Sequence, residues 1–257
     1  MLIDTHCHLD DERLLPEAAQ ITADFEREGL LCVISSSSDY SSSVVNVGLA
    51  DAYERVYATV GIHPHGAKGK QDSHYDDFKR FAQNPKIVAI GEIGLDYFYD
   101  LSPRDVQKRV FAEQLELADS LRLPVVFHVR DAYEDFLKIV KENKKYLNNG
   151  AALHCYSGSA EFMRELEEFD FYYGFDGPIT YKNARRSIEA LRAADINRVL
   201  FETDAPYLAP VPQRGKTNRP EYVRFVVEKA AEYLGVDFNG LSDISINNAK
   251  RLFKRIK

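Results

Sequence analysis

Ile87-Val88-Ala89-Ile90-Gly91-Glu92 is a short apolar run that ends in a carboxylate, and a second such run, Val125-Val126-Phe127-His128, follows it after an amphipathic stretch. Between the two runs, apolar residues recur from Val106 to Leu121 at steps of mostly three or four, which places them along one face of a helix. Ser102 and Pro103 stand where a capping hydroxyl and a first-turn proline are favoured. The whole stretch therefore predicts a strand–helix–strand unit with parallel strands.

The same alternation extends along the chain, because eight short apolar runs are separated by longer amphipathic stretches. We expect strands at Leu2–His6, Leu30–Ser35, Val56–Ile62, Ile87–Glu92, Val125–Val129, Ala151–Cys155, Phe171–Phe175 and Arg198–Glu202. Eight such units can form an open doubly wound α/β sheet or a closed (β/α)8 TIM-type barrel. Polar residues follow nearly every run, and only a barrel brings all strand ends to one mouth, whereas an open sheet gathers its site at one switch point. We therefore predict the barrel.

The composition is that of an ordinary globular protein. The chain has 257 residues, which fits one barrel, and we expect a single domain over residues 1–257. The formal charge is −7, from 33 basic and 40 acidic residues. Non-specific binding to duplex nucleic acid usually shows as an overall basic excess, which this chain lacks. An anionic substrate would therefore be held by local charge or by metal ions.

The cellular location is suggested by three features of the sequence. The three cysteines are odd in number and form no C-x-x-C pair, which fits a reducing compartment rather than a disulfide framework. The first residues lack the charged and apolar regions of a signal peptide, and no apolar run approaches ~18 residues. We expect a cytoplasmic protein that does not contact the membrane.

Histidines and carboxylates stand at several of the expected strand ends. His6 and His8 end the first strand and point the same way, about 7 Å apart, because side chains alternate along a strand. Such a pair binds metal in some proteins and is an ordinary strand end in others. Glu92 follows an apolar run, where burial of an unpaired carboxylate is costly. A metal ion or a barrel arginine would account for its position.

His128, His154 and Asp204 follow the fifth, sixth and eighth apolar runs. A single histidine in such a place is most often part of the core, but the repetition favours a joint role. The candidate ligands are His6, His8, Glu92, His128, His154 and Asp204. Six ligands exceed the four of a structural zinc and suit two adjacent divalent ions, of which Mg, Mn and Zn are candidates. Two such ions can activate water, with Glu92 and Asp204 as the catalytic carboxylates.

Further polar residues are candidates for substrate binding or for support of the ligands. His63 and His65 end the third strand and face the same mouth. Asp4, Arg130 and Asp131 can orient the ligand histidines, with barrel salt bridges as the alternative.

The segment Ala209–Pro220 is rich in proline and basic residues and follows the last strand. Irregular segments of about a dozen residues are often functional. Arg214, Lys216 and Arg219 in this segment are candidates for contacts with phosphate, and solvent exposure explains them equally well.

Taken together, these motifs resemble the TatD family of metal-dependent deoxyribonucleases, which belongs to the amidohydrolase-like barrels. The matching motifs, in family order, are Asp4-Thr5-His6-Cys7-His8-Leu9-Asp10, Gly61-Ile62-His63-Pro64-His65, Gly91-Glu92-Ile93-Gly94-Leu95-Asp96-Tyr97, His128-Val129-Arg130-Asp131-Ala132, His154-Cys155-Tyr156-Ser157-Gly158, Gly177-Pro178-Ile179-Thr180 and Glu202-Thr203-Asp204-Ala205-Pro206-Tyr207-Leu208. The resemblance implies hydrolysis of phosphodiester bonds in DNA, with 3′-5′ exonuclease action on single strands. It also implies that His6, His8 and Asp204 bind one metal, that His128 and His154 bind a second, and that Glu92 bridges the two.

One motif departs from the family. Where the family often has Asn-Glu-Pro after the last strand, this chain has Asn218-Arg219-Pro220, so a cation replaces an acid.

The expected reaction is attack of an activated water on phosphorus, with Asp204 accepting the proton. Tyr97, Phe98 and Tyr156 are candidates for base stacking, with core packing as the alternative. A metal-dependent amidase, lactonase or deaminase on the same barrel, and a catalytically silent metal-binding scaffold, remain open, because one fold hosts many chemistries.

Overall fold

The computed structural model describes residues 1–257 and contains eight parallel strands that pair in sequence order. The strands are β1 (Leu2–Cys7), β2 (Leu30–Ser35), β3 (Val56–Val60), β4 (Ile87–Asp96), β5 (Val125–Arg130), β6 (Ala151–Leu153), β7 (Tyr172–Phe175) and β8 (Val199–Phe201). Each falls on an apolar run that the sequence marked as a strand. β4 is longer than expected, because the apolar residues Ile93 and Leu95 extend its pairing with β5 beyond Glu92.

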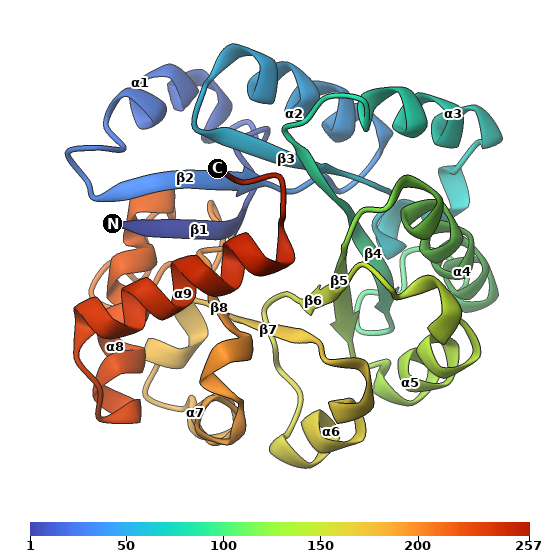
Figure 1. Ribbon diagram of the computed structural model, residues 1–257. Helices are drawn as coiled ribbons and strands as arrows, with labels where there is room; N and C mark the ends of the chain where they lie inside the picture. Colours follow the sequence, from blue (N-terminus) through green and yellow to red (C-terminus); the bar gives the residue numbers. More distant parts are fainter.

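The sheet curls until its first strand meets the segment after its last. Cys7 and Ala205 form a parallel bridge. The His8 amide donates a hydrogen bond to the Ala205 carbonyl oxygen at 2.7 Å, and the Asp204 amide donates to the His6 carbonyl oxygen at 2.9 Å. These contacts close the sheet into a nearly complete barrel with helices around it (Figure 1). The prediction of a (β/α)8 barrel is confirmed.

A helix separates each strand from the next, and two helices follow β8. The helices are α1 (Ala18–Ala23), α2 (Tyr40–Ala52), α3 (Asp72–Phe81), α4 (Arg104–Leu121), α5 (Tyr133–Glu142), α6 (Ala160–Glu165), α7 (Arg185–Ala193), α8 (Val223–Leu234) and α9 (Phe238–Leu252). Short 3-10 helices lie at Leu15–Glu17, Pro64–Gly69, Lys144–Tyr146, Glu167–Phe169, Gly177–Thr180, Ile196–Arg198 and Pro220–Tyr222. None of the helices combines the length and the apolar character that crossing a lipid bilayer requires.

α4 shows how the local sequence determines the buried face of a helix and the residue at which it begins. Its buried residues, among them Val110, Phe111 and Leu115, lie on the apolar face that the spacing predicts. The predicted cap is wrong, because Pro103 occupies the N-cap position and Ser102 makes no cap. The Ser102 hydroxyl instead donates to the His65 carbonyl oxygen at 2.8 Å, which attaches the chain before α4 to the loop after β3.

Two apolar layers place the functional residues at one end of the barrel. The larger layer contains 55 buried residues and lies largely between strands and helices. The smaller contains 14 residues, among them Ile3, Val126 and Leu200 of the strands. Ala249, Leu252 and Phe253 belong to this smaller layer, so α9 and the residue after it close the end of the barrel at which the strands begin (Figure 1). The polar residues are left to the opposite end.

Truncating Phe253 tests this closure. Phe253 is 1% exposed, so Phe253→Ala should lower the free energy of unfolding by about 3–5 kcal/mol, the cost of a large cavity in a packed core. The measurement is urea unfolding followed by circular dichroism with a chelator present, so that metal binding does not contribute. Lys254→Ala, at the exposed neighbouring position, should leave stability nearly unchanged. Equal stability of the two variants would contradict a closing role for Phe253.

Candidate metal centre

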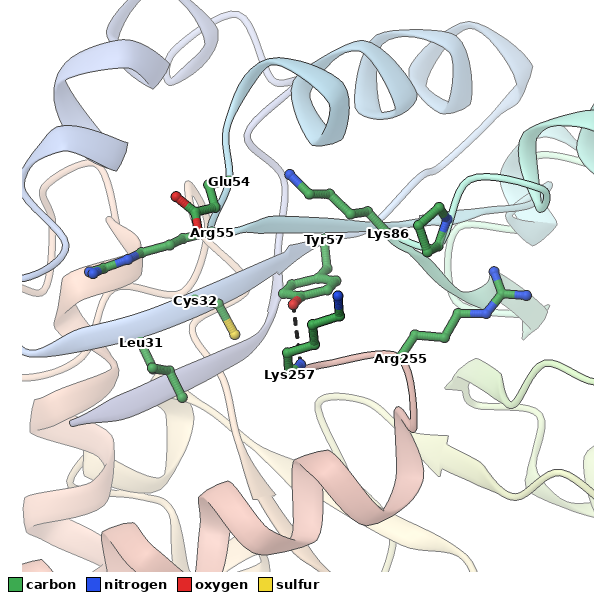
Figure 2. A pocket seen from close by; sticks show the side chains of 9 residues that line it. Leu31, Cys32, Glu54, Arg55, Tyr57, Lys86, Arg255 and Lys257 are labelled. Atoms are coloured by element: carbon green, nitrogen blue, oxygen red, sulfur yellow. Dashed lines mark hydrogen bonds between the residues drawn. The ribbon is translucent and has the colours of Figure 1, made fainter.

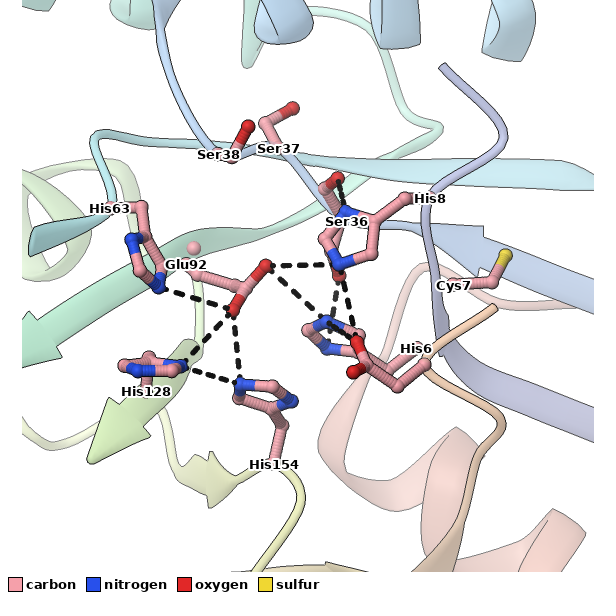
Figure 3. Close-up of polar contacts among 12 residues, drawn as sticks. His6, Cys7, His8, Ser36, Ser37, Ser38, His63, Glu92, His128 and His154 are labelled. Carbon is pink, nitrogen blue, oxygen red and sulfur yellow. Dashed lines mark hydrogen bonds and ion pairs between the residues drawn. The ribbon is translucent and has the colours of Figure 1, made fainter. Parts of the chain in front are cut away.

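The carboxylate of Glu92 lies at the centre of a group of histidines at the barrel mouth (Figure 3). Its Oε1 is 3.3 Å from His6 Nε2 and 3.5 Å from His8 Nε2. Its Oε2 is 3.0 Å from His154 Nε2 and 3.7 Å from His128 Nδ1. Glu92 is only 2% exposed. One buried carboxylate thus presents each oxygen to a different pair of imidazoles.

Asp204 and His63 extend the group on its two sides. Asp204 Oδ1 is 3.3 Å from His8 Nε2 and 3.7 Å from His6 Nε2, and His63 Nε2 is 4.0 Å from Glu92 Oε2. Three sets of side chains have ligand atoms close enough to share an ion: His6, Glu92 and His154; His6, His8 and Asp204; and His63, Glu92 and His128. The structure therefore brings the six predicted ligands together and places His63 beside them. His63 Nδ1 accepts from the His65 amide at 3.1 Å, so its Nε2 carries the proton and is suited to donate a hydrogen bond.

The second ring nitrogen of three histidines is held by a partner outside this group. His8 Nδ1 donates to the Ser36 carbonyl oxygen at 3.0 Å, and His6 Nδ1 is 3.1 Å from Ser36 Oγ. His128 Nε2 donates to Asp96 Oδ2 at 2.9 Å. Metal-binding histidines usually carry such a partner, which fixes the tautomer and aims the other nitrogen at the ion. The rings of His6, His8 and His128 have partners of this kind, as metal-binding histidines do.

The imidazole nitrogens that face Glu92 have few hydrogen-bond partners, and bound cations would supply the missing interactions. His6 Nε2 is buried and has no hydrogen-bond partner, which is rare for a polar atom in a protein interior. His128 Nδ1 lies only 3.1 Å from His154 Nε2. Divalent ions would give His6 Nε2 a partner and would lie between the lone pairs of the other two nitrogens and the solvent. A donor set of imidazoles and carboxylates suits Zn, Mn and related ions.

The electrostatic environment differs among the side chains of the group. Burial disfavours the ionised form of Glu92, but the charges of His154 and His6 outweigh it and hold the pKa of Glu92 well below its usual range. Burial likewise opposes protonation of His8, yet the hydrogen bond with Asp204 and the charge of Glu92 raise its pKa to about 10. Burial prevails at His6, His63 and His128, because it holds their pKa values below the usual range. The group therefore combines ionised carboxylates with neutral imidazoles, which are the forms that bind a metal ion.

Asp4 supports the group through the backbone. Its fully buried carboxylate accepts hydrogen bonds from the Thr203 amide at 2.9 Å, from the Thr203 hydroxyl at 2.6 Å and from the His6 amide at 3.2 Å. It contacts no histidine ring. Asp4 therefore connects β1 to the segment after β8, and this connection fixes the positions of His6 and Asp204.

Two buried carboxylates beside the ligands were not singled out from the sequence. Asp96 is fully buried and accepts from His128 and, at 3.0 Å, from His65 Nε2. Glu202 is 2% exposed, accepts from the Cys155 amide at 2.6 Å, and lies 3.9 Å from His154 Nδ1. A signal existed for both, because Asp96 is four residues after Glu92 in an alternating strand and Glu202 directly follows an apolar run.

Three of the remaining predicted residues have different surroundings. His65 contacts Asp96 and lines the mouth, but it belongs to none of the ligand sets. Arg130 also lines the mouth, with its guanidinium carbon 3.9 Å from the ring centre of Phe98. Asp131 is exposed, does not line the mouth, and orients no ligand.

The basic segment after β8 does not reach the mouth. Arg219 is bound by Glu221 at 2.7 Å and by Glu17 at 2.8 Å. The Arg214 guanidinium lies over the ring of Tyr181 at 4.3 Å, and Lys216 donates to Gln213 at 2.9 Å. None of the three cations lines the cavity of the ligand group, so the structure does not bring them to the site.

Two of the three aromatic residues named as stacking candidates belong to packed structure. Tyr156 is 4% exposed and lies in the larger apolar layer. Tyr97 is half-buried, and its hydroxyl donates to Asp135 at 2.6 Å. Phe98 alone is exposed, at 55%.

The ligand group opens into a cavity of about 400 Å³ at the C-terminal ends of the strands. Its lining includes Glu92 and Asp204 together with Tyr99, Arg130 and Tyr207. Barrel enzymes carry their active sites at this end.

A second cavity, of about 340 Å³, lies at the other end of the barrel (Figure 2). Two of its cations are bound to the protein itself. Lys86 Nζ donates to the carbonyl oxygens of Ala50 and Tyr53, both at 2.8 Å, and Arg255 donates to three carbonyl oxygens, including that of Ile87 at 2.7 Å. The cavity contains no histidine and one carboxylate, that of Glu54. The candidate site is therefore the mouth.

The sequence of this chain is similar to those of known proteins over nearly its whole length. The family of TatD-related DNases matches residues 3–254. The chain is 38% identical to an uncharacterized metal-dependent hydrolase, YabD, of Bacillus subtilis, over 99% of both chains. It is 30% identical to the 3′-5′ ssDNA/RNA exonuclease TatD of Edwardsiella piscicida, over 98% of this chain and 99% of the other.

Solved structures show the same relationship at the level of the fold. The crystal structure of YJJV, a TatD homologue from Escherichia coli, superposes with a TM-score of 0.91 at 27% identity and covers 98% of both chains. An organophosphorus hydrolase from Deinococcus radiodurans shares the fold alone, with a TM-score of 0.64 at 10% identity.

Replacement of Glu92 tests the centre of the cluster. Glu92→Gln keeps the shape of the side chain and removes its charge, so bound metal should fall to a small fraction of the wild-type content. Elemental analysis after dialysis measures the bound metal, and circular dichroism verifies that the variant is folded. Glu12→Gln, at an exposed position, should keep the full metal content. Full loading of Glu92→Gln would contradict the central role of the Glu92 carboxylate in metal binding.

Asp96→Asn tests the outer support. The amide is neutral and has only one acceptor oxygen in place of the two that bind His128, His65 and the Tyr99 amide. Metal affinity should therefore fall about 10–100-fold, as is typical when such partners are weakened. Competition with a chromophoric chelator measures the affinity. An unchanged affinity would mean that Asp96 does not orient His128.

Proposed function

Because this chain belongs to the family of TatD-related DNases, we propose that the cluster at its mouth hydrolyses phosphodiester bonds in DNA as a 3′-5′ exonuclease on single strands. The family expected from the sequence motifs is confirmed. The chain is thus a metal-dependent hydrolase of this family, and the substrate, polarity and number of metal ions are our proposal.

The observation that carries the proposal is the position of Glu92, whose two oxygens face two separate pairs of imidazoles. This arrangement supports a pair of divalent ions, with Mg, Mn and Zn as candidates. Such ions, when bound, lower the pKa of water toward neutrality and offset the negative charge that develops on a phosphate during its hydrolysis.

We propose that Asp204 accepts the proton of the attacking water. Its carboxylate lines the cavity, and its side chain is 14% exposed, more than that of Glu92. Burial would raise its pKa, but the hydrogen bond with His8 lowers the pKa below the usual range, so the group is ionised at neutral pH. An ionised, accessible carboxylate within reach of the substrate is suited to act as a general base.

His63 and Arg130 are the groups that we propose contact the substrate phosphate. His63 lines the cavity beside Glu92, and Arg130 forms no salt bridge within the protein. A guanidinium without a carboxylate partner is free to bind a phosphate oxygen.

The size of the mouth supports action at a strand end. A cavity of about 400 Å³ is within the range of sites that hold one small ligand, roughly 300–1,000 Å³. One terminal nucleotide fits such a space, whereas the width of a duplex does not. The relative from Edwardsiella piscicida, described as a 3′-5′ ssDNA/RNA exonuclease, supports the 3′ polarity and also admits RNA as a substrate.

Digestion of end-labelled single-stranded DNA tests the proposal. Wild-type protein with Mg²⁺, Mn²⁺ or Zn²⁺ should shorten the strand from its 3′ end, and a chelator should abolish the activity. Asp204→Asn should lower kcat about 10²–10⁴-fold, the usual contribution of a general base.

Asp243→Asn, at an exposed position on α9, is the matched control and should keep the wild-type rate. The same samples should be offered esters, lactones and cyclic amides, because the barrel fold hosts such chemistries. Metal-dependent turnover of one of these, with intact DNA, would overturn the proposed nuclease activity.

A further inference from the structure

We propose that Phe98, Tyr99 and Arg130 form a stacking platform on which the terminal bases of the single strand rest beside the metal centre. This inference rests on the proposed function and deepens it. It implies that substrate is selected by the presence of unpaired bases rather than by their identity.

The first support is the exposure of two adjacent aromatic rings. Phe98 is 55% and Tyr99 is 53% exposed, in the loop between β4 and α4. The two rings meet edge to face, with centroids 4.9 Å apart. Neither belongs to the apolar layers of the barrel, so packing does not account for them. Exposed aromatic side chains in a mouth are typical binding surfaces for unpaired bases.

The second support is Arg130, which completes the platform. Its guanidinium carbon lies 3.9 Å from the ring centre of Phe98 and 4.9 Å from that of Tyr99. It has no carboxylate partner, so its planar group is free both to stack on a base and to bind the adjoining phosphate. Arginine is suited to this double role because its guanidinium is flat and always charged.

The third support is the attachment of the platform to the metal centre. The Tyr99 amide donates to Asp96 Oδ1 at 2.8 Å, and the other oxygen of this carboxylate accepts from His128 and His65. Tyr99 and Arg130 also line the same cavity as Glu92. The platform is therefore held at a fixed position relative to the ligands, as positioning of a scissile phosphate requires.

The opposite rim of the cavity is less suited to a polyanion. Tyr207 lies there, but its hydroxyl donates to Asp11 and its ring lies under the guanidinium of Arg13, at 4.5 Å. Arg13 is itself bound by Asp11 at 2.8 Å, and Asp10 adds another carboxylate to the lining. The strand should therefore approach the metal centre across Phe98, Tyr99 and Arg130.

The platform accepts any base, because every base has an aromatic face. It discriminates against a duplex, whose bases are already stacked on one another, and against nucleotides that lack a base.

The test compares a single-stranded oligonucleotide with the same oligonucleotide carrying abasic nucleotides at its 3′ end. For wild-type protein, loss of one stacked base should raise KM about 5- to 150-fold and change kcat little. Phe98→Ala and Tyr99→Ala should raise KM for the intact strand by a similar factor. When a variant acts on the abasic strand, KM should rise little further, because the substitution and the missing base remove the same interaction. Tyr99→Phe should restore the wild-type KM.

Two controls separate stacking from general damage. Arg104→Ala removes a guanidinium that lies over Tyr97 at 4.2 Å, outside the cavity, and should leave KM unchanged. A fully abasic deoxyribose–phosphate oligomer reports on the metal centre alone, so Phe98→Ala and Tyr99→Ala should cleave it as the wild type does.

The outcomes distinguish the two proposals. Failure of wild-type protein to cleave any of these strands would overturn the proposed function and the platform together. Cleavage with a KM that is insensitive to abasic nucleotides, or that is unchanged in Phe98→Ala and Tyr99→Ala, would overturn the platform alone.

Discussion

The arrangement of the mouth depends on one buried carboxylate, that of Glu92, and on the imidazoles around it. A carboxylate that is 2% exposed is strongly destabilised unless charge and hydrogen bonds compensate for the water it has lost. Here the compensation comes from three imidazoles whose nitrogens lie 3.0–3.7 Å from its oxygens. They belong to His6 on β1, His128 on β5 and His154, which follows β6. His6 Nε2 nevertheless has no hydrogen-bond partner, and we propose that bound cations complete the cluster.

The barrel makes this grouping possible by bringing together residues that lie almost two hundred positions apart. His6 follows the start of the chain and Asp204 follows β8, yet the Asp204 amide donates to the His6 carbonyl oxygen. Asp4 strengthens this closure through Thr203. At the other end, α9 seals the barrel with apolar side chains, so polar residues are concentrated at a single mouth. Packing thus determines where the chemistry can occur.

The sequence was sufficient for the barrel and for the convergence of the six candidate ligands, because apolar runs mark the strands and parallel strands end on the same side. It was insufficient where a contact depends on the path of a loop. Arg219 reads as a free cation, but Glu17, some two hundred residues earlier, binds it. Tyr156 reads as a mouth residue, but it is buried. Ser36, which holds both His6 and His8, carries no sequence signal, since serine is common at strand ends.

The central claim is that Glu92 is shared by two cations. Anomalous diffraction from crystals grown with Mn²⁺ or Zn²⁺ tests it most directly. We predict two anomalous peaks at the mouth, one beside each carboxylate oxygen of Glu92, with His6, His8 and Asp204 around one and His128 and His154 around the other. A fully loaded crystal with one peak, or with none in contact with Glu92, would contradict the claim.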